Sequence, residues 1–552
     1  MWKQIAEARH RIARENGTIF KDWGGRVPIA LVYPNTYHVG MSNLGFQTIY
    51  ALLNSYDTVV CERAFWAGQD LHGAGEQIVS IESQRSLDEF AALAFSMTFE
   101  LDYFNLVAIL RQAKIPLFAS QRDERHPLLI AGGPCISANP EPVAPFFDVL
   151  AIGEGEAIVG SLTDVLRQGI HDDRGNLLEA MAQLPGIYVP SLYQTARNVE
   201  GSTRSIAVPS NPPACPATVE RQWVTDLDTY PVHSEVLTDD TELGSMYLIE
   251  VSRGCARGCQ FCLAGFTFLP ARERSFENVL EQARVGLGHR STIGLVGAAT
   301  TDYSQIGPLA TRLRELGARV AVSSLRMDSL TEELLRALLD GGTKTITLAP
   351  EAGSERLRRV INKRLSEEQI LQTADQLAKW KTRRLKLYYM VGLPTETEED
   401  VGDIARLTLD IKRRLDADGK SQVTLNISPF VPKAQTPFQH ESMMEAHVLD
   451  SRIKRIQKEL RRPGIAVRSE SPEWSEVQAV LAKGDRRLAG VLAAMEKTTL
   501  VSWRKALEQT GLSADYYIRR RPAPGETVPW AFVRSGVRPD HVAKRAAAAC
   551  LG

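Results

Sequence analysis

Three cysteines lie close together near the middle of the chain, at Cys255, Cys259 and Cys262, in a CxxxCxxC pattern. Three thiolates at this spacing can hold three irons of a four-iron cluster and leave the fourth iron open. An open iron can bind a substrate or a cofactor, so such a cluster can do chemistry as well as carry electrons. The spacing therefore predicts an iron–sulfur cluster with room for one further ligand.

Two other interpretations of these cysteines are weaker. A structural zinc site takes four ligands, usually in two pairs, and the sequence has no second Cys or His pair at a suitable distance. A disulfide framework needs an even and dense set of cysteines, whereas this chain has 7 among 552 residues and starts without an apolar signal segment. We therefore expect a reducing, cytoplasmic location.

The cluster motif, with the aromatic Phe261 directly before the third cysteine, resembles the defining motif of the radical S-adenosylmethionine (radical SAM) superfamily. In that superfamily S-adenosylmethionine chelates the fourth iron. One electron passed through the cluster cleaves it to methionine and a 5′-deoxyadenosyl radical, which abstracts a hydrogen atom from the substrate. The resemblance implies a [4Fe–4S] cluster, S-adenosylmethionine and a reductant such as flavodoxin or ferredoxin.

Composition fits a large enzyme. The chain is 44% hydrophobic and 24% charged, and its length suggests about three domains. No apolar run reaches the roughly 20 residues that a membrane span needs. The net charge of −1 is unevenly distributed, because residues 451–552 hold 20 Lys and Arg against 10 Asp and Glu. A basic C-terminal region is therefore expected.

Residues 1–195 alternate apolar runs with helical stretches, which is typical of βαβ units and a parallel sheet. The runs are Val27 to Tyr33, Leu93 to Met97, Leu128 to Ala131 and Phe147 to Ile152. Ligand contacts are expected where such strands end, and glycines there let a ligand approach the backbone. The polar and glycine residues at these ends include Ser96, Thr98, Gly132, Gly133, Gly153 and Glu154.

These strand ends resemble the Rossmann-like domain of cobalamin-binding radical SAM proteins, and the resemblance implies that the same six residues contact a corrinoid. The DxHxxG motif of proteins that ligate cobalt through histidine is missing, because His38 has the wrong spacing to Gly40. A bound corrinoid would therefore lack a histidine ligand. Two alternatives remain open, which are a cobalamin-like fold without cobalamin and glycines that serve only as turns.

Residues 196–240 are rich in proline and predict a linker, and residues 241–440 predict the catalytic core. Six strand-like runs alternate with helices in this core, which suits the partial (β/α)6 barrel of the superfamily. The runs are Tyr247 to Val251, Ile293 to Val296, Val320 to Val322, Thr345 to Leu348, Leu385 to Met390 and Val423 to Ile427. The chemistry is expected at the carboxyl ends of these strands.

The resemblance implies that residues at these strand ends bind S-adenosylmethionine. Gly297-Ala298-Ala299-Thr300 departs from the usual Gly-Gly-Glu form, so contacts there would be made by the backbone. A structural turn or an exposed charge is the alternative at each position. The residues expected to bind this cofactor are Phe261, Gly297, Thr300, Ser323, Arg326, Glu351, Ser354 and Gly392.

Longer phrases, such as Pro350 to Arg358 and Gly392 to Thr397, resemble an uncharacterised radical SAM family with an N-terminal cobalamin-binding-like domain. That likeness covers nearly the whole chain and supplies no substrate. Residues 441–552 predict a mainly helical domain with Trp474, Trp503 and Trp530 among arginines. An RNA substrate would suit basic and aromatic residues together. The interpretation we favour is a tryptophan core beneath a solvated basic face.

The sequence thus predicts an α/β radical SAM enzyme. One form of this hypothesis is a cobalamin-dependent methyltransferase. The alternatives are a cobalamin-free modification of RNA or protein, such as methylthiolation, a non-catalytic iron–sulfur protein, and an RNA-binding module with a vestigial core. No residue that acts directly on the substrate can be named from the sequence.

Overall fold

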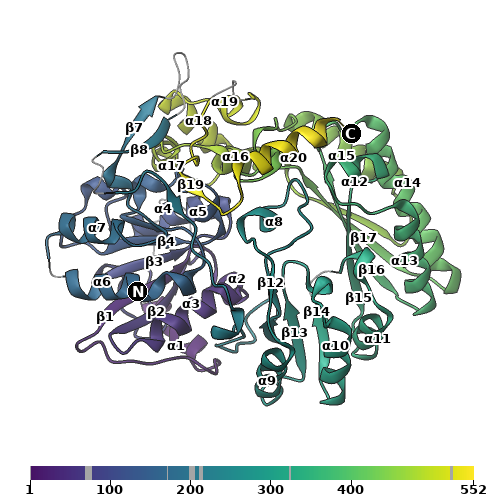
Figure 1. Cartoon of the computed structure of the whole chain (residues 1–552), viewed down its shortest axis with the longest axis horizontal. Coiled ribbons are helices and arrows are strands. Elements are labelled where there is room, and N and C mark those ends of the chain that lie inside the picture. Colours follow the sequence, from purple (N-terminus) through teal and green to yellow (C-terminus); the bar gives the residue numbers. More distant parts are fainter. Residues whose placement is uncertain are drawn as a thin grey trace.

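The computed structural model describes residues 2–68, 77–170, 172–197, 205–210, 215–322, 325–521 and 526–551. Two α/β units lie side by side, and the last helices of the chain cross from one to the other (Figure 1). The mixed α/β class, the parallel sheets and the helical C-terminal region are confirmed. In the described residues, no helix is long and apolar enough to cross a membrane.

The N-terminal unit is built on a six-stranded sheet in the order β2-β1-β3-β4-β5-β6. The first five of these strands run parallel, and β6 is antiparallel to β5. The strands are β1 (Val27–Tyr33), β2 (Val59–Phe65), β3 (Ala92–Ser96), β4 (Leu128–Gly132), β5 (Val149–Ala151) and β6 (Ile187–Tyr188). All residues of β2 are buried although it contains Glu62 and Arg63, and these charges explain why the apolar pattern did not predict this strand.

Helices accompany this sheet, and two of them position the cavity described below. Asn43 caps α3 by accepting a hydrogen bond from the backbone N–H of Phe46 (2.9 Å). The helices are α1 (Trp2–Ile12), α2 (Tyr37–Met41), α3 (Leu44–Ser55), α4 (Tyr103–Gln112), α5 (Pro134–Ala138), α6 (Val159–Gly169) and α7 (Arg174–Ala182).

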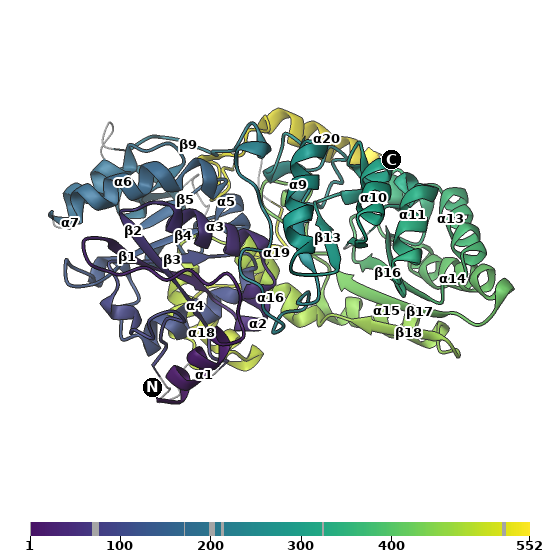
Figure 2. The same ribbon diagram turned by 90° about the horizontal axis from the view of Figure 1, so that it is seen from below.

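The second unit is an open barrel made of two parallel sheets (Figure 2). The first has the order β10-β13-β14 and the second β15-β16-β17-β18, and a bridge between Leu325 and Leu348 joins them. The strands are β10 (Tyr247–Glu250), β13 (Thr292–Val296), β14 (Arg319–Val322), β15 (Thr345–Glu351), β16 (Arg384–Val391), β17 (Gln422–Pro429) and β18 (Ile465–Ser469). All six predicted runs form strands, and β18 adds one more beyond residue 440, where we expected the core to end.

Helices alternate with these strands as the (β/α) pattern predicts. Strong caps begin several of them, and Thr397 with Asp400 forms a capping box at α14. The helices are α9 (Phe276–Leu287), α10 (Ile306–Glu315), α11 (Glu332–Asp340), α12 (Glu355–Val360), α13 (Glu367–Lys379), α14 (Glu398–Leu415) and α15 (Ala446–Glu459).

The segment expected to be a linker contains regular structure. Strands β7 (Tyr193–Arg197) and β8 (Ser205–Pro209) form an antiparallel hairpin. Strand β9 (Val219–Glu220) pairs in parallel with β19 (Val533–Arg534), near the other end of the sequence. The crossing between the two units is therefore tied to the C-terminal region by hydrogen bonds.

The C-terminal helices pack against the N-terminal unit, and the tryptophans belong to this packing. Trp474 and Trp503 both make edge contacts with Phe104 of α4, at centroid distances of 6.1 and 5.9 Å. Trp530 is 2% exposed. These contacts agree with a tryptophan core rather than a stacking surface for bases. The helices are α16 (Pro472–Lys483), α17 (Leu488–Ala494), α18 (Leu500–Thr510), α19 (Ala514–Ile518) and α20 (Pro539–Leu551).

A buried carboxylate, Glu154, joins the two units. It follows β5 and accepts hydrogen bonds from Arg272 (2.6 Å) and Arg253 (2.9 Å) of the barrel unit. Arg221 of the crossing segment lies 3.6 Å away. Burial alone would raise the pKa of Glu154, but Arg272 and Arg253 outweigh it and hold the pKa below its usual value. The carboxylate therefore stays charged and binds segments from both units.

Two further ion pairs support the same interface. Lys433, after β17, contacts Glu100 of the N-terminal unit at 2.6 Å. Arg486, before α17, contacts Glu141 at 2.9 Å, and Glu141 is fully buried. Arg486 thus has a structural partner within the protein.

Replacing Glu154 by glutamine should destabilise the protein by about 3–5 kcal/mol, because it leaves guanidinium groups buried without their anion. The matched control is Glu156→Gln, which removes one contact to Arg253 (2.8 Å) while Arg253 keeps Glu154 and Glu250. Urea or thermal unfolding followed by circular dichroism measures both. Equal losses in the two variants would show that Glu154 has no special role at the interface.

Candidate functional site

The three cysteines lie on one loop that runs from β11 (Ser252–Arg253) to α8 (Ala264–Thr267). Gly254 and Gly258 have φ angles of +80° and +59°, which side-chain-bearing residues rarely adopt. A Cβ on Gly254 would lie 2.4 Å from the carbonyl oxygen of Phe268, so this turn requires glycine. The two glycines therefore shape the loop between and before the cysteines.

Cys259 is buried, Cys255 and Cys262 are partly exposed, and the thiols lie close enough to influence one another. Burial raises the pKa of Cys259, and burial followed by the proximity of Cys259 raises the pKa of Cys262 to about 11. The backbone N–H groups of Gly265 and Ala264 act against this rise and lower the pKa of Cys262, and the N–H of Gly265 donates to the Cys262 carbonyl oxygen (3.2 Å). Such N–H groups stabilise cluster-bound thiolates, so the loop has the donors that an iron–sulfur cluster needs.

The arrangement does not suit a single metal ion. Among the described residues, no three His, Cys, Asp or Glu side chains converge closely enough to hold one ion. A zinc ion needs all its ligands within about 2.3 Å of one centre. A four-iron cluster places each thiolate on a different iron, so its ligands stand further apart. Three thiols without a fourth protein ligand suit a cluster that leaves one iron open better than they suit mononuclear zinc, and the assignment of Cys255, Cys259 and Cys262 as cluster ligands stays a prediction.

Residues from later parts of the chain hold the cluster loop in place. The Asn362 side-chain amide donates to the carbonyl oxygens of Arg257 (3.1 Å) and Gly258 (2.9 Å). Arg257 pairs with Asp302 at 2.7 Å. The backbone N–H of Gln260 donates to the carbonyl oxygen of Ile361 (3.0 Å). The loop is thus fixed from two directions by the barrel.

Three of the residues expected to bind S-adenosylmethionine surround the loop. Glu351 and Arg326 lie close enough to influence the pKa of Cys259, although burial has the larger effect on it. Glu351 pairs with Lys363 (3.0 Å) and Arg326 with Asp328 (2.8 Å).

Phe261 is the third of these residues. It is partly buried and packs against a small apolar cluster beside the loop, which consists of Ala352, Leu357, Val360, Ile361, Leu393, Phe430 and Phe438.

The other expected cofactor contacts differ in their surroundings. Thr300 is 1% exposed and its hydroxyl points to the carbonyl oxygen of Gly297 (3.4 Å). The Ser354 hydroxyl caps α12 and hydrogen bonds to Asp400. Gly392 has φ +82°, and its N–H donates to Glu396 (2.7 Å). Ser323 lies outside the described residues. The two hydroxyls are thus already used within the protein, and their roles in cofactor binding stay predictions.

A cavity of about 660 Å³ lies between the two units and reaches the cluster loop. On the loop side it is lined by Gly254, Ala264 and Phe268, and Gly297 and Ala298 line it at the end of β13. On the other side it runs between the N-terminal sheet and helices α3 and α6, where its walls are mainly apolar. A space of this size is in the range of cofactor sites, about 300–1,000 Å³.

All six residues expected to contact a corrinoid line this cavity, which brings Ser96, Thr98, Gly132, Gly133, Gly153 and Glu154 together. Glu154 does so with a carboxylate that is already occupied by arginines. No histidine is among the described residues that line the cavity. That a bound corrinoid would lack a histidine ligand stays a prediction.

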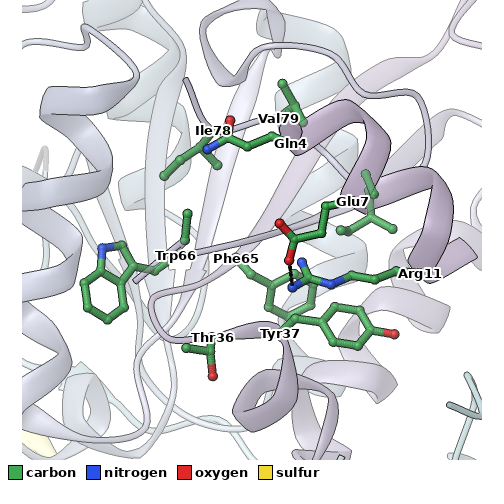
Figure 3. A pocket seen from close by; sticks show the side chains of 12 residues that line it. Gln4, Glu7, Arg11, Thr36, Tyr37, Phe65, Trp66, Ile78 and Val79 are labelled. Carbon is green, nitrogen blue, oxygen red and sulfur yellow. Dashed lines mark hydrogen bonds and ion pairs between the residues drawn. The ribbon is translucent and has the colours of Figure 1, made fainter. Parts of the chain in front are cut away.

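A second, smaller cavity lies beside α1 (Figure 3). It measures about 110 Å³, and Glu7 and Arg11 at its edge form an ion pair at 2.5 Å. The Arg11 guanidinium stacks on Tyr37, 4.5 Å from the ring centroid. Its volume corresponds to a few water molecules, so it is too small for either cofactor.

Sequence reasoning missed several residues of the site. Lys363, which pairs with Glu351, was not among the residues expected at the site. Leu162 and Leu166 of α6 line the cavity, but an apolar helix face carries no signal that its partner is a space. Arg545 of α20 hydrogen bonds to the cluster loop, and nothing in its local sequence indicates this contact.

Comparison with known families supports the same parts of the chain. Residues 45–190 match a family described as radical SAM proteins, N-terminal, and residues 249–408 match the radical SAM superfamily. The first match covers most of the N-terminal sheet, and the second contains the cluster loop and barrel strands β13 to β16.

Relatives extend this likeness. An uncharacterised protein of Methanocaldococcus jannaschii is 29% identical over 479 residues, which is 86% of this chain and 93% of the relative. An uncharacterised methyltransferase of Pyrococcus horikoshii is 24% identical over 52% of this chain and 58% of its own. A ribosomal protein uS12 methylthiotransferase of a Thermotoga species is 27% identical over 38% of this chain and 53% of its own. The chain thus spans little more than half the length of these two named enzymes.

Among solved structures, the cobalamin-dependent S-adenosylmethionine radical enzyme OxsB is similar, with a TM-score of 0.46 and 15% identity over 69% of this chain and 52% of that one. The family matches, together with the cysteine loop at the mouth of an open parallel barrel, confirm the resemblance drawn from the motif. The chain belongs to the radical SAM superfamily.

Proposed function

We propose that this chain is a radical SAM enzyme and that it transfers a methyl group with the help of cobalamin. The observation that carries the proposal is the cavity of about 660 Å³ that joins the cluster loop to the carboxyl ends of the N-terminal strands. The family supplies the first half of this statement, because it implies a [4Fe–4S] cluster and S-adenosylmethionine. The cavity supports the second half.

Cys255, Cys259 and Cys262 would hold the cluster, which when bound supplies the electron that cleaves S-adenosylmethionine. The chain's own residues prepare the surroundings. Backbone N–H groups at the start of α8 donate toward Cys262, and Asn362 fixes the loop carbonyls. Arg326 and Glu351 lie beside Cys259, where they could orient the carboxylate and amino groups of the cofactor.

A Rossmann-like unit that binds no cofactor should not contain a cavity of this size. Protein interiors are close-packed, and side chains normally fill the space between a sheet and its helices. Here small residues such as Ala94, Ala131 and Ala151 line the cavity on the sheet side. Leu162 and Leu166 line it on the side of α6. An apolar space this large is costly unless a ligand occupies it. This supports a bulky, largely apolar cofactor as its occupant.

Cobalamin, when bound there, would supply a carrier for a methyl group between S-adenosylmethionine and the substrate. The chain would hold it by apolar contact and backbone approach at Gly132, Gly133 and Gly153, without a histidine on the cobalt. A second candidate is cobalamin-free modification such as methylthiolation, which the similarity to a methylthiotransferase favours. Binding of the corrinoid separates the two candidates.

Alanine at all three cluster cysteines should abolish iron binding. Anaerobically reconstituted wild-type protein should hold about four irons per chain, and with dithionite and S-adenosylmethionine it should release 5′-deoxyadenosine. The matched control is Cys61→Ala, which removes a buried thiol of β2. A triple variant that keeps its cluster, or a wild-type cluster whose EPR signal ignores S-adenosylmethionine, would contradict the proposal.

Wild-type protein should bind hydroxocobalamin one to one, and its absorbance should be that of a corrinoid without a protein imidazole ligand. Filling the cavity with Leu162→Trp should weaken this binding at least tenfold, because the ring takes the corrinoid's space. The same change should leave the melting temperature of the cofactor-free protein equal or higher, since filling a cavity commonly stabilises by about 0.5–2 kcal/mol.

The control for this test is Gln168→Trp, an exposed position on the same helix that does not line the cavity. It should bind the corrinoid as the wild type does. Equal affinity in Leu162→Trp would show that the cavity is not the binding site. Wild-type protein without corrinoid absorbance after reconstitution would favour the cobalamin-free candidate.

A further inference from the structure

The C-terminal helix α20 reaches the cluster loop from the far end of the sequence. It lies above α8 and extends toward α12, which it contacts (Figure 1). Its residue Arg545 donates a hydrogen bond from Nη2 to the carbonyl oxygen of Gly258 (2.6 Å), between the first and second cysteines. In return the Gln260 side chain donates to the backbone carbonyl of Arg545 (3.2 Å). The helix is therefore fastened to the loop at two points.

The guanidinium of Arg545 sits among groups that hold it in place. It lies 5.6 Å from the centroid of the Phe266 ring, on the helix that follows the third cysteine. A Cβ on Gly258 would lie 2.4 Å from its Nη1, so the glycine that shapes the loop also admits this side chain. Arg545 is partly buried, whereas its neighbour Lys544 is exposed.

The cations around the loop differ in whether they have a carboxylate partner. Arg257, Arg326 and Lys363 each pair with a carboxylate, at 2.7, 2.8 and 3.0 Å. In the described part of the chain, Arg364 and Arg545 have no carboxylate partner. Arg364 is exposed, where water screens its charge. Arg545 is less exposed and touches the loop itself, so its charge acts more strongly there.

A four-iron cluster on three thiolates supplies the missing anion. The thiolates outweigh the double positive charge of the oxidised core, and reduction adds one more negative charge. A fixed cation nearby therefore favours the reduced state over the oxidised one. Arginine suits this role because it stays charged when partly buried and donates in a fixed geometry. Charge and hydrogen bonding near a cluster are established means of setting its potential.

We propose that Arg545 is the cation that offsets the negative charge of the cluster and raises its reduction potential, which makes α20 part of the redox centre. This inference rests on the proposed binding of a [4Fe–4S] cluster to Cys255, Cys259 and Cys262. It concerns how readily the cluster accepts an electron from the reductant, not the substrate. The alternative role for Arg545 is only to anchor α20 to the loop.

The test is a potentiometric titration of anaerobically reconstituted, full-length protein, followed by EPR in the absence of S-adenosylmethionine. Arg545→Gln keeps an N–H donor for Gly258 and removes the charge. It should lower the equilibrium constant for one-electron reduction about tenfold, which equals about 59 mV. Arg545→Lys keeps the charge and should stay near the wild type. Lys544→Gln removes an equal charge from the exposed face of the same helix and should have little effect.

The outcomes separate this inference from the proposed function. If the cluster in Arg545→Gln has the same reduction potential as in the wild type, the proposed role of Arg545 is wrong, while the proposed cluster still stands. Equal shifts in Arg545→Gln and Lys544→Gln would overturn it too, because the effect would then be general. A cluster lost in Arg545→Gln but kept in Arg545→Lys would support it. Wild-type protein that binds no iron would overturn the proposed function and this inference with it.

Discussion

One buried carboxylate, Glu154, joins the two units of this protein. Glu154 follows β5, the last parallel strand of the N-terminal sheet, and binds Arg253 and Arg272 of the barrel unit. Arg253 directly precedes the cluster loop, so the same contact that joins the units also sets where the loop begins. A buried charge is costly unless it is fully paired, and this pairing forms only when both units are in place. The position of the cluster relative to the N-terminal sheet depends on it.

The cavity follows from that arrangement. Two parallel sheets present their carboxyl ends to one another, and polar or glycine-rich turns collect at such ends because the backbone there is free to bind ligands. The space continues inward between the sheet and α6, where Leu162 and Leu166 line it. The walls thus combine an apolar interior with a mouth beside Gly254 and Gly297, where radical chemistry would occur. This geometry favours a carrier cofactor located between the cluster and the N-terminal unit.

The cluster loop is held in place by residues from distant parts of the chain. Asn362 fixes its carbonyls from the turn after α12, and Arg545 contacts it from the final helix. The C-terminal region, which the sequence marked only as basic, has most of its work inside the protein: Arg486 pairs with Glu141, and Trp474 packs on Phe104. Part of its positive charge is therefore used in ion pairs within the protein, and an RNA substrate remains a separate hypothesis.

The sequence by itself determined the radical SAM motif, the parallel α/β class and the strand ends that line the cavity, because cysteine spacing and apolar periodicity are local properties. It did not predict β2, whose Arg63 is buried in ion pairs with Glu15 and Glu82, or β18, which lies beyond the expected core. Only the tertiary structure decided that Glu154 binds arginines, that Thr300 and Ser354 are occupied within the protein, and that Arg545 reaches Gly258. Ion pairs and cavities depend on which segments meet, and that is set by packing across hundreds of residues.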